Sequence, residues 1–146
     1  MFEEVSSASL RGLSVWLPML SGDDPESARA ASENYADDRV EHRWDPERRL
    51  GALFAKRLGL QGVAWDVYVL YSAGVVWHDD DPPEPTFWMH QLPKAAGADE
   101  ARLLHPESLY HAVANALGPG AMPRKDDLAL RLHLKGLQTI GRDRSP

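Results

Sequence analysis

The sequence contains no cysteine among its 146 residues. This absence excludes disulfide bonds, thiolate nucleophiles, cysteine-ligated zinc, iron–sulfur clusters and any redox chemistry that uses a dithiol. No apolar run approaches the roughly 20 residues needed to cross a bilayer. The first ten residues, MFEEVSSASL, are acidic where a secretion signal would be basic. We therefore expect a soluble, cytoplasmic protein without membrane association.

Several familiar sequence motifs are also missing. The chain has no GxGxxG, no GxxxxGKS or GxxxxGKT phosphate loop and no GxSxG nucleophile elbow. These absences argue against the usual nucleotide-binding and hydrolase sites, and we expect no cofactor. The net charge of -6 argues against a nucleic-acid partner held by overall attraction to phosphate.

The composition is otherwise that of an ordinary globular domain. Hydrophobic residues make up 43% of the chain and charged residues 26%, and the length suits a single core. From residue 121 onward, six basic residues face three acidic ones, so this segment is basic while the rest is acidic. We expect an α/β domain over residues 1–120. Residues 121–146 form a basic extension that either packs on that domain, extends into solvent or docks an acidic partner.

The first half of the chain predicts a strand, a helix and a second strand. Residues 13–20, LSVWLPML, form a short apolar run typical of a buried strand. Asp24 is placed to be a helix N-cap with Pro25 at the first helical position, and this helix should continue through residue 35. Residues 39–44, RVEHRW, alternate polar and apolar side chains, which favours a half-buried strand.

The middle of the chain predicts a second helix and then a hairpin. Asp45 and Pro46 repeat the cap-plus-proline signal, and Gly59 is placed to end the helix that follows. Residues 65–71, WDVYVLY, predict a strand covered on both faces at the centre of the sheet. Residues 72–77 predict a tight turn and an antiparallel partner strand for it.

The last third predicts another strand and a helix. An irregular acidic segment at residues 78–85 precedes an apolar stretch at 86–92, which predicts a short strand. Residues 106–117 predict a helix that ends at the following GPG. Alternating leucines at residues 128–134 favour a further strand over a short helix. A βαβ unit followed by a hairpin predicts helices packed on a mixed sheet.

Three stretches of the sequence resemble a group of thioredoxin-like proteins. They are VWLPML at 15–20, RVEHRWDPERRLG at 39–51 and AWDVYVLY at 64–71, the last extended by PPEPTFWMHQL at 82–92. The resemblance implies a small thioredoxin-like mixed sheet with flanking helices. Redox-active members carry a CxxC at the start of the first long helix, where the helix dipole lowers the thiol pKa. The resemblance therefore implies a divergent member that lacks the N-terminal CxxC unit, and no residue here inherits dithiol exchange.

Polar residues near the predicted strand ends are candidates for binding. His42, Trp44 and Asp45 lie where a strand meets a helix N-terminus, which favours either a capping carboxylate or a bound ligand. Asp66 lies in an apolar strand next to Trp65. It is either paired with an arginine or a backbone amide, or it is a general acid/base with a raised pKa.

His90 follows Trp88 in an apolar and aromatic stretch. It is either a core histidine that is hydrogen-bonded to the backbone or, with His42 and Asp66, part of a metal or acid/base site. The acidic segment at residues 78–85 lacks the spacing and glycine of a calcium loop, so we assign no metal ligands.

These observations lead to one principal hypothesis of function and two alternatives. We expect a non-catalytic thioredoxin-like domain that binds a protein or peptide through a groove or an edge strand. One alternative is a metal-dependent or acid/base enzyme that uses His42, Asp66 and His90. The other is a shortened relic with little activity of its own. The ligand-binding residues that we assign are His42, Trp44, Asp45, Asp66, Trp88 and His90.

Overall fold

The computed structural model describes Val5, residues 7–78 and residues 80–118. The elements are β1 (Gly12–Trp16), α1 (Pro25–Ser32), η1 (Glu33–Tyr35), β2 (Val40–Trp44), α2 (Arg49–Leu58), β3 (Val67–Leu70), β4 (Phe87–His90), η2 (Lys94–Ala96), η3 (Glu100–Arg102) and α3 (Pro106–Leu117). The elements labelled η are single turns of 3-10 helix. This is a small mixed α/β domain, and the predicted extension at 121–146 and strand at 128–134 lie outside the described residues.

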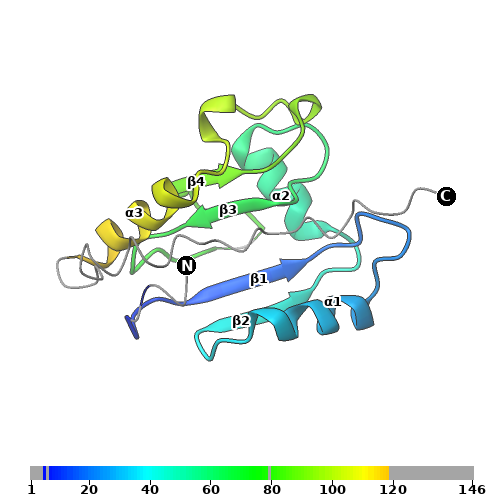
Figure 1. Ribbon diagram of the computed structural model, residues 1–146. Helices are drawn as coiled ribbons and strands as arrows, with labels where there is room; N and C mark the ends of the chain where they lie inside the picture. The colour runs from blue at the N-terminus through cyan, green and yellow to red at the C-terminus, as the bar shows by residue number, and fades with distance from the viewer. Residues whose placement is uncertain (1–4, 6, 79, 119–146) are drawn as a thin grey trace.

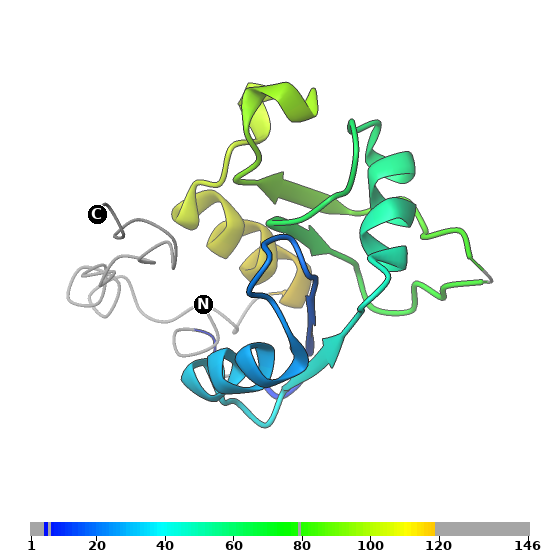
Figure 2. The ribbon, with the colours of Figure 1, turned by 90° about the vertical axis from the view of Figure 1, so that its right-hand side faces the viewer.

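The four strands form two two-stranded sheets. β1 and β2 are parallel, with Trp16 opposite Trp44. β3 and β4 are antiparallel, with Tyr68 opposite Met89. Figures 1 and 2 show the strands in one layer, in the order β2, β1, β3, β4, with α1 and α3 on one face and α2 on the other. No ladder joins the two sheets within the part of the chain that the structure describes.

The predicted start of α1 and both ends of α3 are confirmed, whereas α1 ends at Ser32 and the last three residues predicted for it form the 3-10 turn η1. Asp24 caps α1 by accepting a hydrogen bond from Ser27 N at 2.7 Å, and the Ser27 hydroxyl accepts one from Asp24 N at 3.0 Å. This reciprocal pair satisfies two backbone donors at the helix start. α3 spans the predicted residues, with Pro106 in its first turn and Gly118 at its C-terminus.

The start of α2 differs from the prediction. The helix begins at Arg49 because Arg48 adopts a left-handed conformation with φ 56°, which helical residues do not have. Asp45 is therefore not the N-cap residue. Its Oδ2 still accepts a hydrogen bond from Leu50 N at 2.8 Å, so the carboxylate stabilises the first turn from further back in the chain. Gly59 ends the helix as predicted, at φ 69°.

β1 is shorter and more exposed than the sequence predicts. It ends at Trp16, because the chain then folds into a turn in which Asp23 Oδ2 accepts hydrogen bonds from Met19 N and Leu20 N at 2.8 and 2.7 Å. Leu13 is 60% exposed, so the prediction of a buried strand is wrong. The half-buried strand predicted next is confirmed as β2, in which partly buried and exposed residues alternate.

The prediction for residues 65–71 is only partly right. A strand forms, but it begins at Val67 because Asp66 has a left-handed φ of 53° that interrupts the extended chain. All four residues of β3 are half-buried, and among the described residues β3 forms a ladder with β4 alone. β3 does lie between β1 and β4 in the strand layer and has helices on both faces (Figure 2), so the predicted central position is seen, but full burial and a second hydrogen-bonded neighbour are not.

The predicted hairpin partner at residues 75–77 is also wrong. The partner of β3 is β4, which confirms the strand expected within residues 86–92. The connection between them packs on α2 instead of forming a strand. The Trp77 ring meets Phe54 edge to face, with centroids 5.6 Å apart, and Arg57 Nη2 pairs with Asp81 Oδ1 at 2.7 Å.

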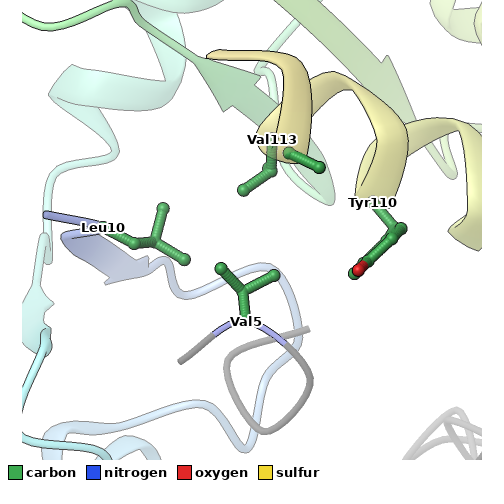
Figure 3. Close-up of a cluster of buried hydrophobic side chains, with 5 residues drawn as sticks. Val5, Leu10, Tyr110 and Val113 are labelled. Atoms are coloured by element: carbon green, nitrogen blue, oxygen red, sulfur yellow. The ribbon is translucent and has the colours of Figure 1, made fainter. Parts of the chain in front are cut away.

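Two clusters of buried side chains hold the elements together. The α3 cluster consists of Val5, Leu10, Tyr110, Val113 and Ala114. Figure 3 shows Val5 and Leu10 on the N-terminal segment pointing toward α3. The α2 cluster consists of Ala55, Leu60, Ala64, Leu92 and Ala96. Leu70 packs on the α3 cluster and Val67 on the α2 cluster, so β3 contributes to both.

Candidate functional site

A polar cluster at the start of β3 contains Asp66, Tyr68 and Gln91. Tyr68 Oη lies 3.1 Å from Asp66 Oδ1 and 2.8 Å from Gln91 Oε1. The backbone reinforces this arrangement, because Gln91 N donates a hydrogen bond to the Asp66 carbonyl oxygen at 3.0 Å. Asp66 and Gln91 are exposed and Tyr68 is half-buried, so a ligand can reach the cluster from solvent. We call these three residues the Asp66 cluster.

The Tyr68 hydroxyl faces two acceptors but carries one hydrogen. A phenol donates a single hydrogen bond, so with the Gln91 amide oxygen toward it Tyr68 satisfies only one acceptor at a time. The other acceptor is open to a donor from outside the chain. In the same amide orientation the Gln91 Nε2 atom points away from Tyr68 and offers two hydrogens. The Asp66 cluster therefore presents both an acceptor and a donor to a ligand.

The surroundings of the Asp66 cluster oppose the ionisation of both its titratable groups. Exclusion of water by the surrounding protein raises the pKa of the Asp66 carboxyl above 3.8, and the hydrogen bond from Tyr68 and the influence of His90 only partly offset this. Burial, followed by the nearby Asp66 carboxylate, raises the pKa of Tyr68 above 10.0. Tyr68 therefore stays a neutral hydrogen-bond donor at neutral pH.

The backbone at Asp66 is unusual. Asp66 and Arg48 are the two residues other than glycine with a positive φ among those that the structure describes. Aspartate and asparagine tolerate this left-handed conformation better than most residues do. The conformation costs conformational energy, and such costs are concentrated at sites of binding or catalysis. At Asp66 this left-handed conformation occurs in the residue whose carboxylate is hydrogen-bonded to Tyr68 Oη.

Two exposed aromatic residues are associated with the Asp66 cluster, because Trp65 precedes Asp66 in the chain and Tyr35 influences Tyr68 electrostatically. Trp65 is 38% exposed and Tyr35 is 49% exposed. Tyr35 lies close enough to Tyr68 that its phenolate would raise the pKa of Tyr68 further. Tyr35 also contacts Trp16 of β1, with ring centroids 6.4 Å apart. Exposed rings around a polar centre are typical of protein-binding surfaces.

His42 belongs to a different environment, on β2 beside Trp16. The indole Nε1 of Trp16 donates a hydrogen bond to His42 Nδ1 at 3.3 Å, so the neutral ring carries its hydrogen on Nε2. That Nε2 atom is buried and has no hydrogen-bond partner among the described residues. Trp44 is half-buried at the end of the same strand, and the Asp45 carboxylate accepts its hydrogen bond from Leu50 N in the first turn of α2. The structure therefore does not bring these residues into the Asp66 cluster.

His90 is buried, with 2% of its surface exposed, and both its ring nitrogens contact the backbone. Nδ1 accepts a hydrogen bond from Leu92 N at 3.1 Å, so Nε2 carries the hydrogen and donates to the Asp99 carbonyl oxygen at 3.0 Å. This is the geometry of a core histidine. The Trp88 ring lies beside it, with centroids 5.9 Å apart.

The metal site of the alternative hypothesis has no matching geometry in the described chain. Across residues 5, 7–78 and 80–118, no three histidine, aspartate or glutamate side chains are placed to hold a metal ion. His90 influences the pKa of Asp66, but both its nitrogens are engaged.

Sequence reasoning singled out Asp66 but missed Tyr68 and Gln91. The alternation of a strand places Asp66 and Tyr68 on one face, which was the available signal for Tyr68. Gln91 comes from the next strand, and its position depends on the pairing of β3 with β4.

No protein-family model, no curated protein and no solved structure matches this chain. In the portion that the structure describes, none of the helices has both the length and the apolar character required to span a membrane. Function is therefore inferred from the chemistry of the Asp66 cluster and the residues around it.

Proposed function

We propose that the chain is a non-catalytic thioredoxin-like domain that binds an extended segment of a protein or peptide at the Asp66 cluster. The order of the elements supports the thioredoxin-like part of this proposal. A βαβ unit is followed by a helix, an antiparallel strand pair and a final helix, and helices cover both faces of the strand layer. This is the architecture that the sequence resemblance implies.

The observation that carries the binding proposal is the excess of acceptors at Tyr68. With the Gln91 amide oxygen toward Tyr68, one hydroxyl hydrogen serves both Asp66 and Gln91, so one acceptor is available to a ligand. An extended peptide offers backbone N–H and C=O groups side by side, which match a carboxylate next to an amide. The exposed rings of Tyr35 and Trp65 provide surface on which the side chains of the peptide can pack.

A binding role suits this site better than an acid/base role. The histidine nearest to Asp66, His90, has both nitrogens hydrogen-bonded to the backbone. Tyr68 is a weak acid here, because burial raises its pKa. Asp66 therefore has no partner ready to exchange a proton at neutral pH, whereas hydrogen bonding to a ligand needs no such exchange.

Peptide selection tests the proposal directly. Peptides enriched from a random displayed library on the immobilised full chain should bind Asp66→Asn and Tyr68→Phe at least about tenfold more weakly, because Asp66→Asn removes the carboxylate acceptor and Tyr68→Phe removes the hydroxyl that holds Asp66 and Gln91 in position. Isothermal titration calorimetry measures the affinities. Glu47→Gln, which removes an exposed carboxylate before α2, should leave them unchanged. Failure to enrich any peptide, or equal affinity for all four proteins, would contradict the proposal.

Asp66→Asn should also raise the stability of the fold. The pKa of Asp66 is raised in the folded state, so between pH 3.8 and that higher value the folded state holds a proton that the unfolded state has lost. Its stability therefore falls as the pH rises through this window and stays lowered above it. Asparagine tolerates the left-handed φ and cannot ionise. We expect Asp66→Asn to have a higher Tm than the wild type at neutral pH.

The pH dependence provides the control for this prediction. The difference in Tm between Asp66→Asn and the wild type should grow as the pH rises from below 3.8 and then level off. A lower Tm for Asp66→Asn at neutral pH would show that the carboxylate stabilises the fold. Asp66 would then be a structural residue instead of one kept for binding at a cost in stability.

A further inference from the structure

A second candidate binding site lies along β4, outside the Asp66 cluster. It is a shallow hollow of about 340 Å³. Residues 87–89 form one wall, Asp99, Ala101 and Arg102 from the η3 region form another, and Ser108 comes from the first turn of α3. The hollow therefore joins three elements that are separate in the sequence.

Arg102 is held in place without a carboxylate partner. Its guanidinium carbon lies 4.8 Å from the centre of the Trp88 ring, and Nη1 donates a hydrogen bond to the Trp88 carbonyl oxygen at 3.4 Å. No ion pair to Arg102 forms within the described residues. A guanidinium stacked on an indole keeps its remaining N–H groups fixed in one plane, which suits bidentate binding of a carboxylate.

Neither neighbouring acidic group forms an ion pair with Arg102 in the described part of the chain. Asp99 also lines the hollow, where its Oδ1 accepts a hydrogen bond from Ala101 N at 2.9 Å, and because it keeps its charge a bound carboxylate must lie on the Arg102 side of the hollow. Glu100 pairs with Lys94, with 3.2 Å between the charged atoms. Ser108 makes no hydrogen bond through its hydroxyl to any other described residue, so that group can donate to a ligand.

We propose that this hollow binds a small aromatic carboxylate. The carboxylate lies on the N–H groups of Arg102 and the hydroxyl of Ser108, and the ring of the ligand packs on the apolar surface along residues 87–89. The charge selects for an anion, and the apolar wall together with the small volume selects for a single ring. The proposal does not depend on the Asp66 cluster, because no residue is shared between the two sites.

Titration with benzoate, followed by two-dimensional amide and indole NMR of the full chain, tests the proposal. We expect saturable shifts of the Trp88 indole and Arg102 side-chain signals, with a Kd of the order of 1 mM. Benzamide has the same ring without the charge and should shift these signals much less. Acetate has the charge without the ring and should bind several-fold more weakly than benzoate.

Variants decide whether Arg102 is the anion-binding group. Arg102→Gln should weaken benzoate binding by at least about tenfold, and Ser108→Ala by a few-fold, because a charge-assisted hydrogen bond is stronger than a neutral one. Arg49→Gln removes an exposed arginine of α2 that does not line the hollow and should leave binding unchanged. If Arg102→Gln fails to fold, Arg102→Lys tests the same contact by keeping the charge without the planar stack, with weaker binding expected.

Three results would overturn the proposal. The first is the absence of saturable shifts from benzoate in the folded wild-type chain. The second is unchanged affinity in the folded Arg102 variant, and the third is equal shifts from benzoate and benzamide, since either would show that charge recognition at Arg102 does not operate.

Discussion

His42 and His90 differ in how their ring nitrogens are satisfied, although both lie beside tryptophans. His90 uses both nitrogens, one toward Leu92 N and one toward the Asp99 carbonyl oxygen. His42 uses one, at 3.3 Å from Trp16 Nε1, and its buried Nε2 has no partner among the described residues. A buried donor without a partner destabilises a fold, whereas a buried histidine with two partners is hard to replace.

This difference predicts unequal costs for the same substitution. His90→Phe leaves the Leu92 N–H and the Asp99 carbonyl without partners, and we expect it to lower the free energy of unfolding by about 2–4 kcal/mol. His42→Phe breaks one long hydrogen bond but also removes an unsatisfied buried donor, so we expect a loss below about 1 kcal/mol. Chemical denaturation of the two variants measures this. Equal losses would mean that the backbone contacts of His90 contribute little.

Sequence reasoning at the scale of single residues identified unusual chemistry but not its geometry. A carboxylate among apolar residues marked Asp66, and the histidine in an aromatic stretch was expected to be either a ligand or a core residue bonded to the backbone. The left-handed conformation of Asp66 and the two partners of Tyr68 depend on the three-dimensional path of the chain. No pattern of residue types contains that information.

At the scale of elements, α2 depends on the absence of a side chain at Gly51. A Cβ atom there would lie 2.5 Å from Val63 Cγ1 and 2.9 Å from the Ala64 carbonyl oxygen. The Ala64 N–H donates to the Gly51 carbonyl at 2.9 Å, so the segment after α2 is fixed against this point of the helix. The backbone of residue 64 cannot move away without breaking that hydrogen bond.

Gly51→Ala should therefore destabilise the fold even though alanine favours helices. Alanine gains about 1 kcal/mol in helix propensity, but overpacking against a fixed backbone costs more, and we expect a net loss of about 1–3 kcal/mol. Gly22→Ala is the matched control, because no atom lies within 4 Å of its added Cβ. Thermal and chemical denaturation should show no more than about 0.5 kcal/mol of change for the control. A stabilised Gly51→Ala would mean that α2 and residues 63–64 separate easily.

Local signals predicted the helices better than the strands. The cap, proline and glycine signals of α1 and α3 act within one turn of helix, so they can be identified from neighbouring residues. β3 instead pairs with β4 across a long connection. Residues 75–77 do not form the partner strand of β3, because Trp77 packs on Phe54 of α2. Turn residues next to a strand indicate where the chain bends, but they do not specify which later segment returns to pair with it.

At the scale of the whole molecule, β3 is the element that couples the two hydrophobic clusters. Its side chains alternate between faces, so Leu70 contributes to the α3 cluster and Val67 to the α2 cluster. Each cluster contains few large side chains, and a two-stranded sheet is marginal without packing on both faces. Neither cluster should therefore be stable without the other, and the domain should unfold in one step.

Substitutions in the two clusters test this coupling. Val113→Ala in the α3 cluster and Leu92→Ala in the α2 cluster remove side chains that are 1% and 5% exposed, and we expect losses of about 2 and about 3 kcal/mol. Because unfolding is cooperative, each variant should lower the hydrogen-exchange protection of the most protected amides in both clusters by the same factor. Loss of protection confined to the mutated cluster, or two separate denaturation transitions, would show that β3 transmits no stability between the two faces.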